Sequence, residues 1–476
     1  MNAKPKNART KIVATIGPAS RDPQTLADLV EAGVDVFRLN MAHGTRDEHD
    51  QTLSSIRTIS EQLQRPLAVL VDLAGPKIRL GQLLGDLVVC EPSARLRIVR
   101  GDSSTQADEL VTNYPNLIDE LQPGDRVLLA DATVELSVQT KSSDAVECQV
   151  TQPGTVRSRQ GVNLPGVQLS ISPLSDKDRE AARWAATHDV DFLGLSFVRR
   201  AAEILELKQI VREQEATAHV IAKIEKPEAL EHLDEIVEAA DGVMVARGDL
   251  GAEIDIAKVP LLQKKIIAAC NRRQRPVIVA TQMLASMEHS GHPTRAEVTD
   301  VANAVLDGAD ACMLSGETAI GKHPIAAVVM MNRIAETTEA AYRTSTHVLD
   351  EDRVTDVHQI TEAVVYGAAR IARQLDASLL VVATRSGATA LALSKQRLYT
   401  PVLAMSERPA TRRRMSLYWG LTPVAETPLA DWAALKDFVA EWAERQGHAK
   451  SGDFVVMVAG TGVAEGVHNA IEVNPI

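Results

Sequence analysis

Short runs of apolar residues recur along the chain, and each is followed by polar residues and then by a helical segment. The runs consist of Val, Ile, Leu and Ala in almost unbroken succession, which is typical of strands in a parallel sheet buried on both faces. They begin at Lys11, Val34, Leu67, Asp191, His219, Asp241, Pro276 and Asp310. Eight such strand–helix units predict an α/β fold built on a closed (β/α)8 barrel of the TIM type.

The segments between these runs carry helix signals. Asp22 and Pro23 predict the start of a helix that ends near Gly33, because aspartate caps free backbone N–H groups and proline fits the first helical turn. In the segment 294–307 apolar residues recur at helical spacing, so we expect that face to pack on the barrel. The residues concerned are Val298, Val301, Val305 and Leu306.

A long insertion separates the third and fourth predicted strands. Residues 74–168 contain β-rich runs with turn signals between them. The runs begin at Arg95, Arg126, Val134 and Ala145. They predict an inserted β-barrel domain that would lie over the carboxyl face of the main barrel and close on it as a lid.

Strands and helices alternate again after about residue 345. The apolar runs of this part begin at Ser378, Pro401 and Phe454. They predict a C-terminal open α/β domain, for which the hydroxyl-rich turn described below suggests a regulatory role. The expected domains are a barrel of residues 1–73 and 169–345, a lid of residues 74–168 and a C-terminal domain of residues 346–476. Within the last, the basic run 412–414 is typical of a solvated helix face.

Composition argues against several classes of function. Aromatic residues make up 3% of the chain, which disfavours base stacking, and the net charge of -12 opposes binding to nucleic acid or to a membrane surface. The apolar runs fall short of the roughly 18 residues that a membrane span needs, and the basic residues at the start are not followed by an apolar stretch of the kind that a secretory signal has. The four cysteines form no CxxC pair, so we expect reduced thiols and a cytoplasmic protein.

The sharpest chemical signal is a lysine and a glutamate in the fifth run. Lys223 and Glu225 are two residues apart on a predicted strand, so both side chains can reach the barrel mouth. Asp249 closes the next run. Two carboxylates are the protein share that Mg²⁺ prefers, and Lys223 could neutralise a phosphoryl group in transfer. The alternative is a lysine–glutamate pair on a solvated strand end.

Polar residues also end the other predicted strands. In a closed parallel barrel they converge on one mouth, so we interpret them as one site for a metal and a phosphorylated anion. They are Arg38, Asn40, Asp72, Ser196, Thr281, Ser315 and Glu317. The turn that contains Gly248 would offer backbone N–H groups to a carboxylate or phosphate, although its glycines fit a simple tight turn equally well.

A hydroxyl-rich turn follows the first strand of the predicted C-terminal domain. It contains Thr384, Arg385, Ser386, Gly387 and Thr389. Such hydroxyl and amide groups are typical of a phosphate nest, so we hypothesise a regulatory phosphate site. The alternative is a strand-to-helix turn in which Ser and Thr act as N-caps.

Several longer motifs run through the chain. They include Lys11-IVATIGPAS, Arg38-LNMAHG, Asp72-LAGPKIR, Gly161-VNLPG, Ala222-KIEKPEAL, Met244-VARGDLGAEI, Ala280-TQMLASM, Pro293-TRAEVTDVANAVLDGAD and Met313-LSGETA. With these motifs the chain resembles the pyruvate kinase family over essentially its whole length. The resemblance implies phosphoryl transfer from phosphoenolpyruvate to ADP, giving pyruvate and ATP in glycolysis. It also implies Mg²⁺, which Mn²⁺ could replace, a homotetramer, and activation by a sugar phosphate or an AMP-type effector near residues 384–389.

The resemblance also assigns roles at the strand ends. Lys223 becomes the phosphoryl-transfer lysine, and Glu225 with Asp249 become the ligands of the divalent metal. Gly248 and Thr281 would hold the substrate carboxylate, and either Thr281 or a nearby water would protonate the enolate.

Further residues receive roles in the same way. Arg38 and Arg79 would contact phosphates, and Asn40 and His43 would approach the nucleotide. The remaining residues of the pocket would be Ser196, Ser315 and Glu317.

The chain departs from the better-known family pattern in one connected place. Many members have RLNFSHG and DTKGPEIR where this sequence has Arg38-LNMAHG and Asp72-LAGPKIR. Ala42 and Leu73 remove two hydroxyl ligands of a monovalent cation, and Lys77 replaces a carboxylate by an ammonium that could supply the cation's charge near Asp72. We therefore predict that K⁺ is not required, as in a potassium-independent subgroup of the bacterial type.

Two other functions are compatible with these residues. A metal-dependent lyase or aldolase barrel acting on pyruvate would use a similar mouth but would have no use for the lid. A catalytically silent sugar-phosphate sensor would need the C-terminal turn but not the complete set of Lys223, Glu225 and Asp249.

Overall fold

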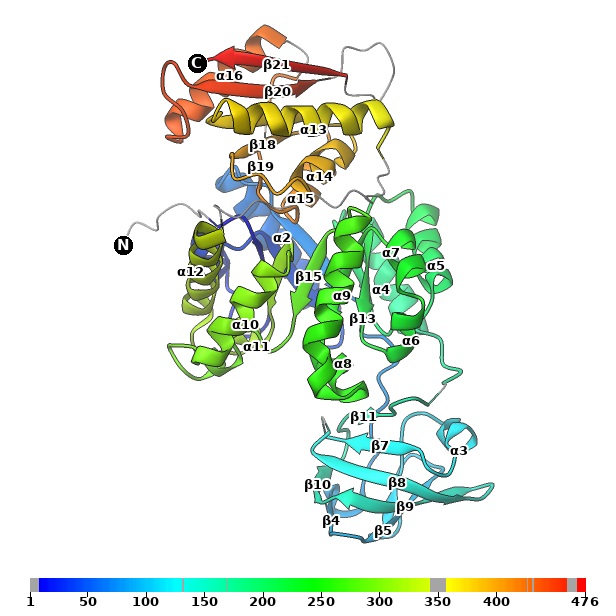
Figure 1. The fold of residues 1–476 in the computed structure, drawn as a ribbon. Coiled ribbons are helices and arrows are strands. Elements are labelled where there is room, and N and C mark those ends of the chain that lie inside the picture. Colours follow the sequence, from blue (N-terminus) through cyan, green and yellow to red (C-terminus); the bar gives the residue numbers. More distant parts are fainter. Residues whose placement is uncertain are drawn as a thin grey trace.

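The computed structural model describes residues 8–130, 132–167, 169–342, 357–425, 427–429, 432–459 and 469–476. Within them, eight parallel strands form a closed barrel in the order β1-β16-β15-β14-β13-β12-β3-β2 (Figure 1). These strands are β1 (Lys11–Thr15), β2 (Val36–Asn40), β3 (Ala68–Asp72), β12 (Phe192–Leu195), β13 (His219–Ile224), β14 (Gly242–Ala246), β15 (Val277–Ala280) and β16 (Ala311–Leu314). Each predicted apolar run contains one of them, so the predicted barrel is confirmed.

Helices follow the strands and cover the outside of the barrel (Figure 1). They are α1 (Pro23–Ala32), α2 (Arg46–Gln62), α4 (Asp176–Thr187), α5 (Ala201–Glu213), α6 (Pro227–Glu231), α7 (Leu233–Ala239), α8 (Arg247–Glu253), α9 (Val259–Arg272), α10 (Arg295–Leu306), α11 (Gly316–Ala319) and α12 (Pro324–Tyr342). The predicted signals of α1 are confirmed: Asp22 accepts a hydrogen bond from the Thr25 N–H at 3.0 Å, and Gly33 follows the last residue.

The apolar face of α10 differs in part from the prediction. Val301 is buried and Val298 packs against the barrel core, but Leu306 is 42% exposed. At about 100° per residue, Leu306 stands roughly 140° around the helix from Val301, outside the buried stripe. Ala304, which lies roughly 60° from Val301 on that scale, takes the buried position instead.

The segment between β3 and β12 folds as a separate unit of small sheets. Its described residues form a six-stranded sheet of order β11-β7-β8-β9-β5-β6 and a two-stranded sheet of β10 and β4. Its elements are β4 (Leu87–Cys90), β5 (Arg95–Val99), β6 (Glu109–Leu110), α3 (Leu117–Glu120), β7 (Arg126–Leu129), β8 (Val134–Lys141), β9 (Ala145–Gln152), β10 (Gly154–Arg157) and β11 (Val162–Asn163). The unit has its own buried core. It lies beyond the carboxyl end of β3, which is the position predicted for the insertion (Figure 1).

The C-terminal part forms an open α/β sheet, as predicted. Among its described residues the strand order is β19-β18-β17-β20-β21, all parallel except β21, which runs antiparallel to β20. The elements are α13 (Gln359–Gln374), β17 (Leu379–Ala383), α14 (Ala388–Ser394), β18 (Val402–Met405), α15 (Pro409–Met415), β19 (Leu421–Pro423), α16 (Trp432–Arg445), β20 (Phe454–Ala459) and β21 (Ala470–Pro475). The two edge strands, β19 and β21, were not among the predicted runs.

The C-terminal domain packs on the amino-terminal ends of the barrel strands, opposite the insertion (Figure 1). Among the described residues, four aspartates stand just before alternate barrel strands, and each accepts a hydrogen bond from a backbone N–H of a neighbouring strand. These basal aspartates are Asp35 (from Ile12, 2.9 Å), Asp191 (from Val69, 2.8 Å), Asp241 (from Val220, 2.8 Å) and Asp310 (from Val277, 2.8 Å). Cations of the C-terminal domain reach two of them: Lys395 pairs with Asp310 at 2.6 Å and Arg413 with Asp191 at 2.7 Å.

The predicted domain limits fall partly outside the described residues. The boundary between residues 345 and 346 lies there, as does Gln168 at the end of the predicted lid, so these limits stay predictions. None of the helices in the described part of the chain combines the length and the apolar character that a bilayer crossing requires.

Candidate active site

Lys223 is the centre of a buried charged cluster at the carboxyl end of the barrel. Its ammonium donates to the Ser196 hydroxyl at 2.6 Å and lies 2.9 Å from Glu225 Oε1 and 3.2 Å from Asp72 Oδ1. Strand alternation places Lys223 and Glu225 on the same side of the chain as β13 ends. The structure therefore brings together the pair that the two-residue spacing predicts.

Burial and neighbouring charges act on these groups in opposite directions. Burial by itself lowers the pKa of Lys223, but the Asp72 and Glu225 carboxylates outweigh it and hold that pKa above its ordinary value. Burial raises the pKa of Glu225, and Asp249 adds to this effect while Lys223 opposes it. Lys223 is thus a cation at neutral pH, and the mutual repulsion of Glu225 and Asp249 is what a further cation would relieve.

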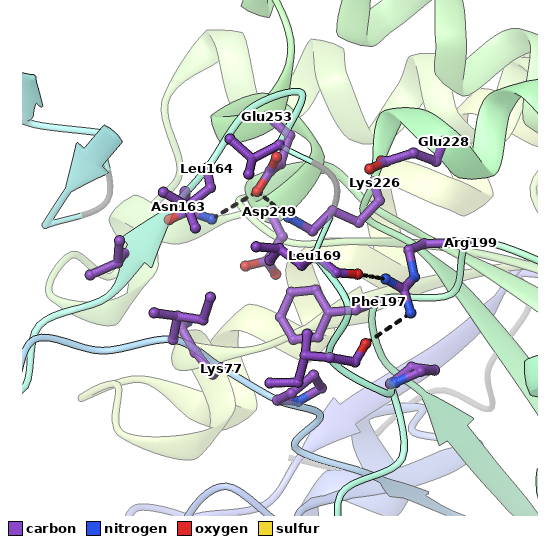
Figure 2. Close-up of a pocket in the computed structure, with 16 residues that line it drawn as sticks. Lys77, Asn163, Leu164, Leu169, Phe197, Arg199, Lys226, Glu228, Asp249 and Glu253 are labelled. Carbon is purple, nitrogen blue, oxygen red and sulfur yellow. Dashed lines mark hydrogen bonds and ion pairs between the residues drawn. The ribbon is translucent and has the colours of Figure 1, made fainter. Parts of the chain in front are cut away.

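Glu225 and Asp249 fit the role of metal ligands. Glu225 is buried and accepts a hydrogen bond from the Phe197 N–H at 2.7 Å. Asp249 lies in α8 and lines a pocket beneath the inserted unit (Figure 2). Two hard carboxylates suit Mg²⁺, which completes its octahedron with phosphate oxygens and waters. In the described ranges no three His, Cys, Asp or Glu side chains gather around one metal position, and the assignment of Glu225 and Asp249 as ligands stays a prediction.

Arg38 extends the cluster toward β2. Its Nε donates to Asp72 Oδ2 at 2.7 Å and its Nη1 to the Thr15 hydroxyl at 3.0 Å. Asp72 is buried by this contact and by Lys223; burial would raise the pKa of its carboxyl, but Lys223 and Arg38 outweigh burial and lower it. Two cations around one carboxylate leave the mouth with positive groups to offer to a phosphate.

The loop after β15 is held in a strained conformation. Thr281 has a φ of 69° and Gln282 a φ of 55°, a region that a β-branched residue rarely adopts. The Thr281 hydroxyl accepts a hydrogen bond from the Gly248 N–H at 2.7 Å, and Arg247 donates to the Thr281 carbonyl at 2.8 Å. The two segments predicted to hold the substrate carboxylate are thus in direct contact.

Ser315 and Glu317 follow β16 beside this loop. Glu317 is buried and accepts hydrogen bonds from the Leu284 N–H at 3.0 Å and from the Ser315 N–H at 2.7 Å. It therefore ties the loops after β15 and β16 together. The Ser315 hydroxyl is buried and has no hydrogen-bond partner among the described residues, so its bonding capacity is free for a ligand.

The residues predicted to contact the nucleotide lie further out. The Asn40 side chain accepts from the Ala42 N–H at 3.2 Å, and His43 is exposed in the following loop. Arg79 belongs to the inserted unit, where it donates to the Arg159 carbonyl at 3.1 Å. Asn40 is in register with Asp72 on the neighbouring strand, but none of these three side chains contacts Lys223, and their roles stay predictions.

Lys77 does not reach Asp72 in this arrangement. Its exposed side chain lines the pocket beneath the inserted unit (Figure 2), and its ammonium has no ion-pair partner in the described part of the chain. Arg38 and Lys223 neutralise Asp72 instead. Leu73, the neighbouring departure from the family pattern, is buried and accepts a hydrogen bond at its carbonyl from Ser196 at 2.8 Å.

In the hydroxyl-rich turn of the C-terminal domain, side-chain hydroxyls accept hydrogen bonds from backbone N–H groups of the same turn. Thr384 accepts from the Gly387 N–H at 3.1 Å, and Ser386 accepts from the next N–H at 3.3 Å. The exposed side chains are those of Arg385 and Ser386, and the buried ones are those of Thr384 and Thr389. The residue at the N-cap of α14 is Gly387, which makes no side-chain cap, so these bonds stabilise the turn itself and the phosphate site stays a prediction.

Sequence reasoning did not single out two charged residues next to the metal ligands. Lys226 directly follows Glu225, and Glu253 stands four residues after Asp249 on α8; their side chains form an ion pair at 2.6 Å. The spacing placed each of them near a ligand. Nothing in the sequence showed that they contact each other.

The family profiles, curated proteins and solved structures that match this chain agree with one another, and the matches extend over most of its length. The family profile described as "Pyruvate kinase, barrel domain" matches residues 7–328, and "Pyruvate kinase, alpha/beta domain" matches residues 362–474. A curated protein named "Pyruvate kinase" from Staphylococcus aureus (strain MRSA252) is 37% identical over 469 residues, 98% of this chain and 80% of that protein. One from Staphylococcus epidermidis gives the same values. The crystal structure of a pyruvate kinase from Cryptosporidium parvum matches with a TM-score of 0.93 and 32% identity, over 98% of this chain and 96% of the other.

Proposed function

The chain belongs to the pyruvate kinase family of phosphotransferases, and on this premise we propose that it moves the phosphoryl group of phosphoenolpyruvate to ADP, yielding pyruvate and ATP in glycolysis. The observation that carries the proposal is the buried cluster of Lys223 with Glu225 and Asp72, next to Asp249. A lyase would have no use for the inserted lid, and a sensor would not need a buried lysine together with two candidate metal-ligating carboxylates.

In this mechanism Glu225 and Asp249 would hold Mg²⁺ or Mn²⁺, and the ion would supply positive charge to the phosphate oxygens. Arg38, which shares Asp72 with Lys223, would bind the phosphate. Lys223 would stabilise first the phosphoryl group in transfer and then the enolate oxygen. Because its hydrogen bonds to Ser196 and Glu225 fix its position beforehand, little reorganisation is needed during the reaction.

Thr281 and Gly248 would receive the substrate carboxylate, and Thr281 or a water near it would return a proton to the enolate. The strained Thr281 backbone favours this role, since strain is retained where a specific geometry is needed. Ser315 would lie beside the substrate, with its hydroxyl available. Asn40, His43 and Arg79 would meet the nucleotide when the insertion closes as a lid.

We propose that turnover does not need K⁺. Ala42 and Leu73 carry no hydroxyl, and the Lys77 ammonium is free of ion pairs among the described residues, so one protein cation is available in place of the ion. We also propose a cytoplasmic homotetramer that a sugar phosphate or AMP-type ligand activates at residues 384–389. The support for this effector site is the pair of exposed polar side chains, Arg385 and Ser386, in front of α14.

The experiment that tests the function is a measurement of pyruvate formation from phosphoenolpyruvate and ADP with Mg²⁺, in K⁺-free buffer and with K⁺ added. We expect turnover in both. Turnover only with K⁺ would retain the enzyme and remove the K⁺ proposal. If no pyruvate forms even with sugar phosphates or AMP present, while these ligands bind in calorimetry, the chain acts as a sensor. Pyruvate cleavage or condensation without ADP would indicate the lyase.

A further inference from the structure

Lys226 and Glu253 form a buried ion pair between the two elements that carry the candidate metal ligands. The Lys226 ammonium lies 2.6 Å from Glu253 Oε1, and the two side chains are 13% and 1% exposed. Lys226 is the residue after Glu225, and Glu253 is one helical turn after Asp249 (Figure 2). The pair therefore links the end of β13 to α8, one residue after Glu225 and four residues after Asp249.

Stability alone does not account for this pair. Taking two charges out of water is costly, and apolar side chains of similar size would hold two elements together equally well. Moreover, Glu253 Oε2 is buried and has no hydrogen-bond partner among the described residues. A buried oxygen left without a partner destabilises the protein, so its retention points to a requirement other than packing. A charged hydrogen bond differs from an apolar contact in fixing both distance and direction.

The same carboxylate also touches the inserted unit. Asn163, the last residue of β11, donates its amide to Glu253 Oε1 at 3.4 Å (Figure 2). On the other side, the Lys226 ammonium lies 5.9 Å from the centroid of the Phe197 ring, and the Phe197 N–H holds Glu225 Oε2. Contacts thus run without a break from the insertion, through Glu253 and Lys226, to the segment that presents Glu225.

We propose that Lys226 and Glu253 are positioning residues that set the separation of the Glu225 and Asp249 carboxylates for a divalent cation, and that Asn163 couples this setting to the lid. The inference rests on the proposed metal site. The Lys226–Glu253 ion pair then contributes to the affinity for the divalent cation. The contact between the lid and the barrel also depends on whether that cation is bound.

The test is Mn²⁺ binding to the full-length protein without substrate, followed by the electron paramagnetic resonance signal of the free ion. We expect Lys226→Met and Glu253→Gln each to weaken Mn²⁺ binding by about 10-fold, the lower end of the range for residues that orient metal ligands. Lys226→Arg, which keeps the charge, should recover part of the loss. Asn163→Ala should bind Mn²⁺ like the wild type in the absence of ADP, and added ADP should change its Mn²⁺ affinity less than it changes that of the wild type.

Lys208→Met is the matched control. Lys208 pairs with Asp241 at 2.7 Å at the opposite end of the barrel, so the variant removes a partly buried ion pair far from the metal ligands. It should lower the melting temperature and leave Mn²⁺ affinity unchanged. If Lys226→Met does not fold by circular dichroism, the nearly isosteric Glu253→Gln carries the test.

The possible outcomes distinguish failure of the proposed metal site from failure of the positioning role. Absence of Mn²⁺ binding in the wild type, or unchanged binding in Glu225→Gln and Asp249→Asn, would overturn the proposed metal site itself. If the wild type binds and these variants do not, but Lys226→Met and Glu253→Gln bind like the wild type and only melt earlier, the pair is a structural tie and the positioning role is refuted.

Discussion

Lys395 of the C-terminal domain donates a hydrogen bond to Asp310 at 2.6 Å, and the same carboxylate oxygen accepts one from the first residue of barrel strand β15. The two side chains are 1% and 0% exposed. Arg397 approaches the other carboxylate oxygen at 3.2 Å. One basal aspartate is therefore shared between the barrel and the C-terminal domain, and a change to either partner acts on both.

Lys395→Met should destabilise the protein by about 3 kcal/mol, because it leaves the buried Asp310 with one cation fewer. The free energy of unfolding in urea measures this loss. Lys436→Met is the control, because Lys436 pairs with Glu472 at 3.3 Å on the surface, where both side chains are exposed. This variant should lower the free energy of unfolding by at most about 1 kcal/mol. Equal losses in the two variants would contradict the buried ion pair as the cause.

The pH dependence of stability should also depend on Lys395. Burial, against the opposing charge of Asp310, lowers the pKa of Lys395 to about 8. The unfolded chain, with the ordinary value near 10.5, then binds more protons between about pH 8 and 10.5, so the free energy of unfolding rises with pH in this window. Relative to Lys395→Met, the wild type should gain stability from pH 8 upward. Parallel pH curves for the two proteins would show that the shift is absent.

Lys223→Met should lower kcat by about 10²- to 10³-fold, the effect typical of removing one preorganised charge that faces the transition state. Ser196→Ala removes the acceptor that orients the ammonium and should have a smaller effect in the same direction. Steady-state kinetics with phosphoenolpyruvate measure both. A variant that changes KM for phosphoenolpyruvate and leaves kcat intact would assign Lys223 to substrate binding alone.

Lys77→Glu should make turnover depend on K⁺, because the variant removes the protein cation and supplies a carboxylate in its place. Rates are compared in K⁺-free buffer and with added K⁺. Lys77→Gln is the control that removes the charge without adding a ligand, and it should be slow in both buffers. A Lys77→Glu variant that works equally well without K⁺ would count against the account of Ala42, Leu73 and Lys77.

Thr281→Ser should keep most of the activity and Thr281→Val should lose it, by at least about 10²-fold if the hydroxyl acts in proton transfer. The valine keeps the β-branched shape at φ 69° but removes the acceptor of the Gly248 N–H bond. Pyruvate formation and the exchange of solvent deuterium into pyruvate distinguish transfer of the phosphoryl group from protonation. Equal activity of the serine and valine variants would favour water as the proton donor.

Much of this fold could be predicted because the barrel strands are buried on both faces and therefore appear as continuous apolar runs. The edge strands β19 and β21 escaped prediction for a related reason. Strand β19 is three residues long, and β21 has one neighbour and mixes apolar with polar residues, so neither gives a continuous run. The signal that identifies a central strand is weak at the edge of a sheet.

Contacts between segments that are far apart in the sequence were the hardest feature to predict from it. The basic run 412–414 has the composition of a solvated face, yet Arg413 pairs with Asp191, and Arg414 is buried and donates to the Thr217 carbonyl. Periodicity shows which face of a helix is polar, but not whether water or another domain meets it. For the same reason the spacing of Lys223 and Glu225 on one strand was readable, whereas the contact of Lys226 with Glu253 was not.

The insertion enters and leaves the barrel side by side, since Arg79 and Gly161 pair in an antiparallel bridge. A segment whose two ends are adjacent can be exchanged as a cassette, because a short turn between those ends would restore the barrel chain without moving its strands. Residues 80–160 are in this sense a separable structural unit. Its loss would leave the carboxyl end of the barrel uncovered. Its replacement would place a different domain over the same catalytic residues.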